Sequence, residues 1–490
     1  MKVTLRRAAF LGLLLTTLSP ADSFLGLKTE RPQAAKKRPL PQSSQLGKKM
    51  EVFATTPAKP SDQAGVLDEE IVSFSPKGSV LSSAALIAGN TVGAGIIALP
   101  LVSLEPGYVP SSAILTGIWA YNLFTGLLIA EACASSVKKM EGEDCSASSD
   151  SCKVGSEASL LKVVGANLGE GGAKVASFVG LALTYLLIIA YITEGGHFIS
   201  STLGWGEGGL SQIAPALFTG GMLAVWKGGS QLVESANNIF CLTLVAAFLA
   251  LVVAGGPGID PANLTNHMDW GMASTVVPVA MAALVYQNTV PVVCSQLDQD
   301  PGKVKQALFY GSGGPLLLYY IYNFLVLGSI PFIAGMEGLG SLSQGGLFSA
   351  PGFSEAMRVF SLSAVVTSFI GSLYSGMAEI EGILESTQDF LPQALRRDGP
   401  ARTAAADALL LGPPLMASMA GSASLFLGAL GACGTLDTAL YGLLPSLAVW
   451  AARYGPNAPA TGDDVEELAP GGSWGVLAAG LVSSALLFVH

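Results

Sequence analysis

The stretch Gly89-Asn90-Thr91-Val92-Gly93-Ala94-Gly95 interrupts the first long apolar segment of the chain. Three of its seven residues are glycine, which weakens a helix and permits non-helical backbone. Within a membrane, irregular backbone persists only where it lines a cavity or packs against protein. A helix that restarts after such a break offers free N–H groups and the positive end of its dipole, which bind carboxylates. The stretch therefore predicts a broken membrane helix with an anion-binding site.

The same glycines permit a second interpretation. Gly89 and Gly93 have the G-x-x-x-G spacing of small-residue faces on which two membrane helices pack closely. The stretch alone does not separate a binding site from such a packing face.

The composition indicates a membrane protein. Of the 490 residues, half are hydrophobic and only 12% are charged, and the mean hydropathy is +0.53. Soluble domains carry about 25% charged residues. The 59 glycines also fit membrane helices, where glycine permits close backbone approach.

Eleven apolar stretches have the length of about 17–25 residues that a membrane-spanning helix needs. They cover approximately residues 79–104, 110–134, 174–198, 210–227, 236–256, 272–294, 307–334, 358–378, 404–420, 424–452 and 472–489. These stretches predict an all-α polytopic membrane domain over residues 79–490. The longest connection, residues 137–174, contains a Ser-rich run and predicts a solvated, partly disordered loop.

The sixth stretch is also interrupted, at Val285-Tyr286-Gln287-Asn288-Thr289-Val290-Pro291. The polar residues lie in mid-segment, and the proline removes a backbone donor. Breaks in the first and sixth of eleven segments are what a five-plus-five inverted repeat predicts, with the substrate bound between them.

The basic residues predict the orientation of the domain. Twelve of the 25 lysines and arginines precede residue 79, and twelve more fall in alternate connections on that same side, whereas only Arg358 lies on the other. The positive-inside rule then places the N-terminus in the cytosol-equivalent compartment. Residues 1–50 hold ten basic and two acidic residues, which leaves 15 basic against 33 acidic residues in the rest. No basic patch remains there for a nucleic acid partner.

The N-terminus resembles a targeting sequence. Residues 1–27 contain Arg6-Arg7, a short apolar run from Ala8 to Leu18, and Phe24, as in a secretory signal. Residues 28–49 are basic and nearly free of acidic residues, as in an organelle transit peptide.

Together they resemble the bipartite presequence of algae with complex plastids. The resemblance implies a plastid-targeting presequence over residues 1–50 and a plastid (chloroplast) envelope location, and residues 51–78 predict a disordered tail. The alternative is a signal anchor with a disordered basic tail, which would leave the protein in the plasma membrane or an endomembrane.

Cysteine and histidine patterns indicate neither a metal nor a cofactor. The six cysteines and three histidines have no zinc, redox or metal-ligand spacing. The sequence also shows no P-loop and no nucleophile–base pair, so we expect no enzyme activity. Two breaks at related positions favour a transporter over a channel with continuous pore helices. A permease-like sensor that does not transport remains an alternative.

Several stretches together resemble the hydroxy/aromatic amino acid permeases, which include tyrosine- and tryptophan-specific transport proteins. The first is G-N-T-V-G-A-G-I-I-A-L-P (89–100), with Gly107-Tyr108 beyond it. The others, in chain order, are T-G-L-L-I-A-E (125–131), A-Y-I-T-E-G-G (190–196), Y-Q-N-T-V-P (286–291), T-S-F-I-G-S-L-Y-S-G (367–376), Gly412-Pro413-Pro414 and L-L-P-S-L-A-V-W (443–450). The resemblance spans residues 79–490. It implies eleven helices in the amino acid–polyamine–organocation (APC) fold and secondary active symport, with protons, of aromatic or other neutral amino acids.

The resemblance also implies the binding residues. The backbone of the first break would hold the substrate carboxylate, through Gly89, Asn90, Thr91, Gly93, Ala94 and Gly95. The second break would meet the amino group and side chain, through Tyr286, Gln287, Asn288 and Thr289. Tyr191 in the third segment and Ser368 in the eighth add polar groups to the predicted cavity.

Membrane-embedded carboxylates are candidates for ion coupling. We predict Glu194 and Glu379 for this role, although Glu194 and the Glu379-Ile-Glu381 pattern both depart from the family. Glu131, Glu194 and Glu379 all lie near segment ends, so a solvated interfacial carboxylate is the alternative for each. Sodium coupling would instead need carbonyl and hydroxyl oxygens near the first break and the eighth segment.

Overall fold

The computed structural model describes residues 78–142, 160–205, 210–329, 352–387, 391–396, 399–421, 424–455 and 467–489. Within these ranges the ordered elements are helices, and no strand occurs, which confirms the all-α prediction for this part of the chain. The predicted presequence, residues 1–50, lies outside the described residues. The predicted tail, residues 51–78, also lies outside them except for Gly78.

The first five segments begin with a broken helix. Helices α2 (Val80–Thr91) and α3 (Gly95–Ser103) meet at an angle of 59°. The following long helices are α4 (Tyr108–Gly142), α5 (Leu160–Thr202), α6 (Ala214–Lys227) and α7 (Ser230–Gly255). Short helices η2 (Ser211–Ile213), η3 (Gly256–Gly258) and α8 (Pro261–Thr265) lie in the connections.

The second five segments also begin with a broken helix. It comprises the 3-10 helix η4 (Trp270–Val276), α9 (Val277–Ala283), the short η5 (Gln287–Thr289) and α10 (Val290–Gln296). The later helices are α11 (Pro301–Gly328), α13 (Phe353–Ser386), α14 (Gln393–Arg396), α15 (Pro400–Ala420), α16 (Leu425–Asp437), the π-helical turn η8 (Thr438–Leu443), α17 (Leu444–Tyr454) and α18 (Gly472–Leu486).

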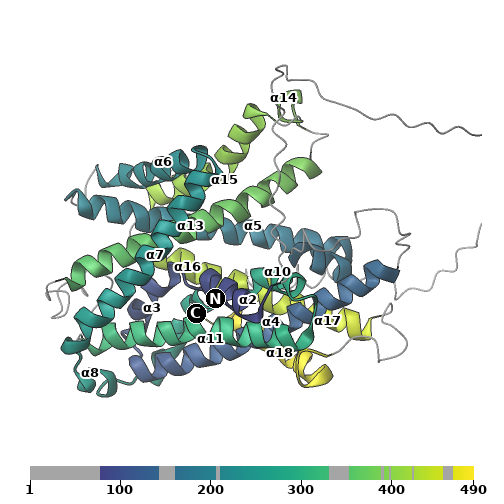
Figure 1. The fold of residues 1–490 in the computed structure, drawn as a ribbon, viewed down its shortest axis with the longest axis horizontal. Coiled ribbons are helices and arrows are strands. Elements are labelled where there is room, and N and C mark those ends of the chain that lie inside the picture. Colours follow the sequence, from purple (N-terminus) through teal and green to yellow (C-terminus); the bar gives the residue numbers. More distant parts are fainter. Residues whose placement is uncertain are drawn as a thin grey trace, which may run out of the picture. The chain divides into compact units, whose positions relative to one another are not determined.

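The contacts between helices repeat in the two halves of the chain. Helix α2 packs on α11, and in the second half α9 and α10 pack on α4. Helix α7 packs on α13, and correspondingly α16 packs on α5. Figure 1 shows α2, α4, α10 and α11 in one group, with α5, α6, α7, α13 and α15 in another. This correspondence is the pattern of a five-plus-five inverted repeat.

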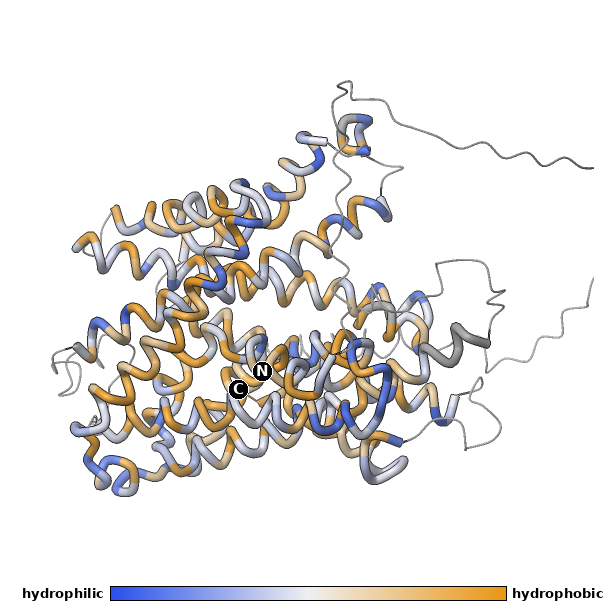
Figure 2. Tube along the Cα trace, in the orientation of Figure 1, coloured by the Kyte–Doolittle hydropathy of each residue, from blue (hydrophilic) through white to orange (hydrophobic). Residues whose placement is uncertain are grey.

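All eleven predicted apolar stretches contain helices, although they differ in length. Six described helices are long and apolar enough to cross a membrane, and a seventh span follows if α2 and α3 count as one. Hydrophobic residues run along most of these helices, with hydrophilic residues gathered towards their ends (Figure 2). The number of eleven membrane spans stays a prediction.

The predicted solvated, partly disordered loop over residues 137–174 is wrong at both ends, and its Ser-rich centre lies outside the described residues. Helix α4 continues to Gly142, and α5 already begins at Leu160. The apolar side chains of Leu160, Val163 and Val164 are buried, which explains the early start of α5. The backbone leaves the helical conformation at Gly169, where φ is +74° and glycine is favoured.

Asp300 starts α11 at an exposed turn after the second broken helix. Its carboxylate accepts a hydrogen bond from the backbone N–H of Lys303 at 3.0 Å, as an N-cap does. This bond, with the Lys303 ammonium at 3.2 Å, lowers the pKa of the Asp300 carboxyl.

Glu131 is buried and paired, so the solvated interfacial alternative is wrong for this residue. Its side chain is 2% exposed, and Arg453 of α17 donates to both carboxylate oxygens, at 2.6 and 2.7 Å. The backbone N–H groups of Leu468 and Ala469 donate to the same carboxylate. Such a bidentate pair compensates the cost of burying both charges, and it ties α4 to α17 and to the segment before α18.

Candidate binding cavity

A cavity of about 1160 Å³ lies where the two broken helices meet. Every residue from Ala88 to Gly95 lines it, so the whole first break faces the cavity. Helices α5, α7 and α13 supply most of the remaining wall, and Asp437 of α16 and the adjoining turn η8 add to it. The second break contributes Val285 and Asn288.

The first break can bring its backbone to the cavity wall because several of its residues are glycine or alanine. Helix α2 ends at Thr91, whose hydroxyl donates to Ile87 O at 2.8 Å within its own helix. Val92 is extended, with φ −77° and ψ 99°. At the start of α3, the N–H of Ala94 donates to Ser368 Oγ at 3.0 Å. The positive end of α3 and a hydroxyl from α13 therefore meet at one point of the cavity wall.

The second break turns its large polar side chains away from the cavity. Tyr286 is fully buried, and its hydroxyl donates to Asn122 O of α4 at 3.1 Å. Gln287 accepts from the N–H of Tyr286 at 2.8 Å and donates to Thr125 Oγ1 at 3.1 Å. The hydroxyl of Thr289 donates to Tyr286 O at 2.7 Å. These side chains satisfy the polar groups of the break and anchor it to α4.

Two contacts join the breaks to each other. Asn90 and Asn288 exchange amide hydrogen bonds of 2.9 and 3.3 Å at the cavity wall. The buried hydroxyl of Tyr319 in α11 lies 2.7 Å from Thr91 O and 2.8 Å from Ala283 O, the last carbonyls of α2 and α9. The hydroxyl has one proton, so these two carbonyls share it.

The glycines of the first break have different surroundings. A Cβ on Gly89 would meet nothing within 4 Å, whereas a Cβ on Gly93 would lie 2.5 Å from Ser368 Oγ. A Cβ on Gly95 would lie 2.9 Å from the Cα of Ala283. Close helix packing therefore occurs at Gly95, and the G-x-x-x-G pair of Gly89 and Gly93 is not a helix-packing face.

The structure brings most of the predicted site residues together. Those that line the cavity are Gly89, Asn90, Thr91, Gly93, Ala94, Gly95, Asn288, Tyr191, Ser368 and Glu379. Tyr286, Gln287, Thr289 and Glu194 are not part of its wall. The roles of all these residues in binding and coupling stay predictions.

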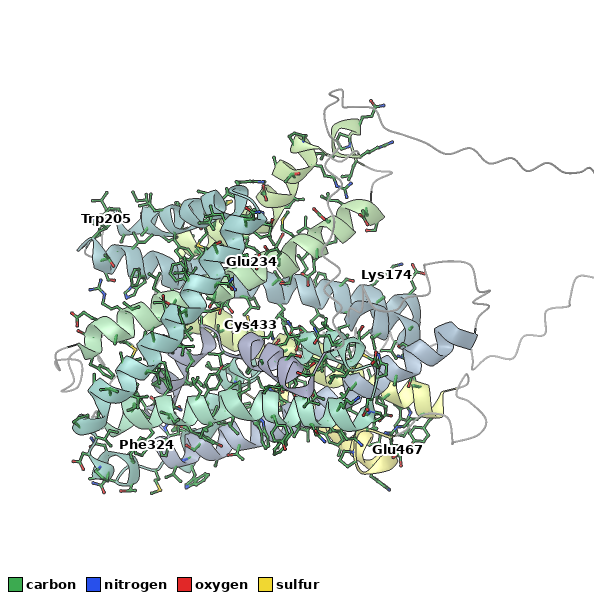
Figure 3. All side chains as sticks on the ribbon, in the orientation of Figure 1. Lys174, Trp205, Glu234, Phe324, Cys433 and Glu467 are labelled. Carbon is green, nitrogen blue, oxygen red and sulfur yellow. The ribbon has the colours of Figure 1, made fainter. Side chains whose placement is uncertain are left out.

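The cavity extends towards the end of the bundle that carries most lysines and arginines, here called the basic end. Its wall on α7 begins at Ser230, three residues after Lys227, and on α13 it runs from Thr367 to Glu379 in the second half of the helix. Lys174 and Glu467 mark this end in Figure 3, and Trp205 and Phe324 mark the other.

On the other side of the breaks, aromatic side chains fill the space between the helices. Phe360 of α13 is fully buried, with its ring centroid 5.4 Å from that of Tyr322 and 6.0 Å from that of Phe248. Phe218 and Phe369 form an edge-to-face pair with ring centroids 5.5 Å apart. None of these five rings lines the cavity.

Three polar residues in or beside the cavity were not predicted from the sequence. Asp437 and Glu234 line the cavity, and Tyr319 holds both breaks. A signal existed for Asp437, because it is an acidic residue in the middle of the tenth apolar stretch. Tyr319 gave no comparable signal, because nothing in the sequence distinguishes it from the nearby Tyr320 and Tyr322.

Comparison with known proteins gives matches along most of the chain. A sequence model of the tryptophan/tyrosine permease family matches residues 77–461. The chain is 25% identical over 389 residues to the tyrosine-specific transport system 1 of Haemophilus influenzae, which covers 76% of this chain and 88% of that protein. It is 24% identical over 304 residues to glutamine transporter 2 of Aliivibrio fischeri, with coverages of 60% and 72%.

A solved structure shares the fold. The crystal structure of MhsT in complex with L-phenylalanine superposes with a TM-score of 0.52 at 15% identity and covers 84% of this chain and 98% of that one. At this level of identity the likeness concerns the arrangement of helices alone.

Proposed function

Because the chain belongs to the tryptophan/tyrosine permease family, a family of membrane transporters and not of enzymes, we propose that it carries aromatic amino acids by secondary active transport. Tyrosine and tryptophan are the proposed substrates. The observation that carries the proposal is the first break, which lines the cavity from Ala88 to Gly95 and contains three glycines.

The substrate carboxylate would bind at the start of α3. The N–H groups at this helix end and the positive end of its dipole attract an anion. Ser368 Oγ already lies 3.0 Å from the N–H of Ala94, and Tyr191 lines the wall nearby. The amino group and side chain would face the second break, where Asn288 and Val285 are available.

The cavity is large enough for an aromatic amino acid. Ligand pockets usually measure about 300–1,000 Å³, and this cavity of about 1160 Å³ extends from the first break towards the basic end. The alternative is another neutral amino acid. It is favoured by the likeness to a relative named a glutamine transporter.

A proton gradient is the proposed energy source. Glu379 lines the cavity and Glu194 does not, so Glu379 is better placed to exchange a proton with solvent in this conformation. Sodium coupling is the alternative. It would require free carbonyl oxygens at the first break, where Thr91 O already accepts from Tyr319.

Transport would be tested in proteoliposomes with radiolabelled tyrosine, tryptophan, leucine and glutamine. We expect tyrosine or tryptophan to accumulate when a proton gradient is imposed, and to equilibrate without it. Empty liposomes and a sodium gradient at equal pH are the controls. Failure of every amino acid to accumulate under either gradient would contradict the proposal and favour a sensor.

The proposed location is a plastid envelope membrane. The support is the composition of residues 1–50, with Phe24 following the signal-like segment. A fluorescent protein fused behind residues 1–50 should enter the plastid of an alga with complex plastids, and the Phe24→Ala variant should not. Delivery of the unaltered fusion to the plasma membrane would refute plastid targeting.

A further inference from the structure

Buried carboxylates in the described part of the chain fall into two kinds. Glu131, Asp407 and Asp437 are each at most 9% exposed. Glu131 forms an ion pair with Arg453, and Asp407 forms one with Lys227. Neither of these two lines the cavity. Asp437 does line the cavity, and no ion pair joins it to a described basic residue.

Asp437 lies at a distorted point of its helix. It is the last residue of α16, directly before the π-helical turn η8. Such turns are rare and are frequent at functional sites. Asp437 is 2% exposed, and its Oδ1 has no hydrogen-bond partner among the described residues. An unsatisfied carboxylate oxygen in such a place is costly unless something binds it.

Glu379 supplies a second carboxylate on the cavity wall, with a half-buried side chain. It lines the same cavity, and its Oε2 is buried without a hydrogen-bond partner among the described residues. Glu379 lies against α5, beside Gly180 and Thr184. Tyr441 of the π-helical turn is close enough to interact electrostatically with both Asp437 and Glu379.

No described lysine, arginine or histidine forms an ion pair with Asp437 or Glu379, and Glu234 of α7 adds a third acid to the cavity wall. The titratable side chains that interact with Asp437 are Tyr191 of α5, Cys433 of α16 and Tyr441 of η8. Helix α9 also packs on α16 and contains no titratable residue. Figure 3 labels Cys433 near the middle of the bundle, between its two ends. With no cationic partner among the described residues, the buried charge of Asp437 is costly unless a cation binds it.

The chemistry of the site favours a proton over a divalent metal ion. Calcium takes about six to eight oxygen ligands and magnesium about six. The described residues contain no cluster of three or more histidine, cysteine or acidic side chains that could hold a metal. A buried carboxylate without a cationic partner binds a proton in preference to remaining charged.

We propose that Asp437 is the proton-binding carboxylate that couples this transporter to a proton gradient, with Glu379 as a second acid along the same cavity wall. The inference rests on the proposed function and adds Asp437, which lies outside the predicted coupling residues. A proton would enter from solvent through the cavity, pass Glu379, bind the Asp437 carboxylate and neutralise its charge while the adjoining substrate site is occupied. Glu194, which does not line the cavity, would have no part in this step.

The test uses the full chain in proteoliposomes and the Asp437→Asn variant, which keeps the size of the side chain and removes its charge. Three quantities would be measured: tyrosine binding, tyrosine counterflow without a pH gradient, and accumulation of tyrosine with proton uptake under a pH gradient. We expect the variant to bind tyrosine and to exchange it by counterflow. It should lose the accumulation and the proton uptake that the pH gradient drives.

Glu379→Gln is the second variant, and it decides the outcome if Asp437→Asn does not fold. Glu381→Gln is the matched control, because Glu381 is exposed on the same helix. Gradient-driven accumulation by Asp437→Asn or Glu379→Gln at the level of the unaltered protein would overturn the inference. Loss of tyrosine binding in a folded Asp437→Asn protein would also overturn it, since the carboxylate would then bind the substrate ammonium. If the unaltered protein transports nothing, the proposed function itself fails.

Discussion

The two breaks occupy equivalent positions in the two halves of the chain, but they differ in the kind of residue they contain. The break between α2 and α3 consists of glycines and small residues, and all of it faces the cavity. The break between α9 and α10 contains Tyr286, Gln287 and Thr289, whose side chains bond to α4 and to the break's own backbone. The first break places its backbone at the cavity wall, with partners from Ser368 and Tyr319, and the second satisfies its backbone mainly with its own side chains.

This difference teaches that a polar interruption in a membrane helix is not in itself a set of ligand contacts. Polar side chains at such a place are needed first to replace the backbone hydrogen bonds that the helix has lost. Glycines cannot do so, and the N–H groups they leave need another partner. We therefore expect substitutions in the first break to change substrate affinity, and those in the second to change stability.

The largest effect is expected for Gly93→Leu. A Cβ at this position would lie 2.5 Å from Ser368 Oγ, so the leucine side chain would occupy the proposed carboxylate site. We expect tyrosine affinity to fall about 100-fold or more, equivalent to about 2.8 kcal/mol, with membrane insertion intact. Equilibrium binding to the purified protein measures this. Gly117→Leu, where a Cβ would meet nothing within 4 Å, should bind normally. Unchanged binding by Gly93→Leu would remove the first break from the site.

Tyr319→Phe tests the contact that serves both breaks. The change removes the donor to Thr91 O and Ala283 O and leaves two buried carbonyls short of a partner. An unsatisfied buried group costs about 1–3 kcal/mol, so we expect a clearly lower melting temperature in detergent. Tyr310→Phe on the same helix is the control, because Tyr310 is 64% exposed. Equal melting of Tyr319→Phe and the unaltered protein would show that the hydroxyl does not hold the breaks.

Gln287→Leu tests the second break alone. It removes the acceptor for the N–H of Tyr286 and the donor to Thr125 Oγ1. The expected loss of stability is about 1–2 kcal/mol, with tyrosine affinity nearly retained in the folded protein. Gln306→Leu, at an exposed position of α11, is the matched control. A large loss of affinity without a change in melting temperature would instead support the predicted direct contact between Gln287 and substrate.

The smallest effect is expected for the amide pair between the breaks. Asn90 and Asn288 are both exposed to the cavity, and water can replace their hydrogen bonds of 2.9 and 3.3 Å. In a double-mutant cycle with Asn90→Ala and Asn288→Ala, we expect a coupling energy of about 0.5 kcal/mol in the substrate-free protein. Thermal unfolding measures it. Strict additivity of the two single changes would mean that the pair does not stabilise the contact between the breaks.

The membrane class and the positions of both breaks could be predicted from sequence, because each depends on local composition. Glycine, proline and polar residues weaken a helix wherever they occur, and apolar stretches of sufficient length enter a bilayer. For the same reason the boundaries of α5 were missed. Leu160 and Val163 belong to a helix because they are buried against other segments. The local sequence does not show which distant segments pack there.

The sequence by itself determined that the chain is a helical membrane protein, that its first and sixth segments are broken, and that the family pattern runs along most of the chain. Only the tertiary structure decided that Tyr286 and Gln287 turn towards α4, that Glu131 pairs with Arg453 across 322 positions, and that Asp437 has no basic partner among the described residues. Backbone conformational preferences depend on residues that are adjacent in the chain, so a short stretch of sequence is enough to predict them. The direction and partner of a polar side chain depend on which distant segments pack around it.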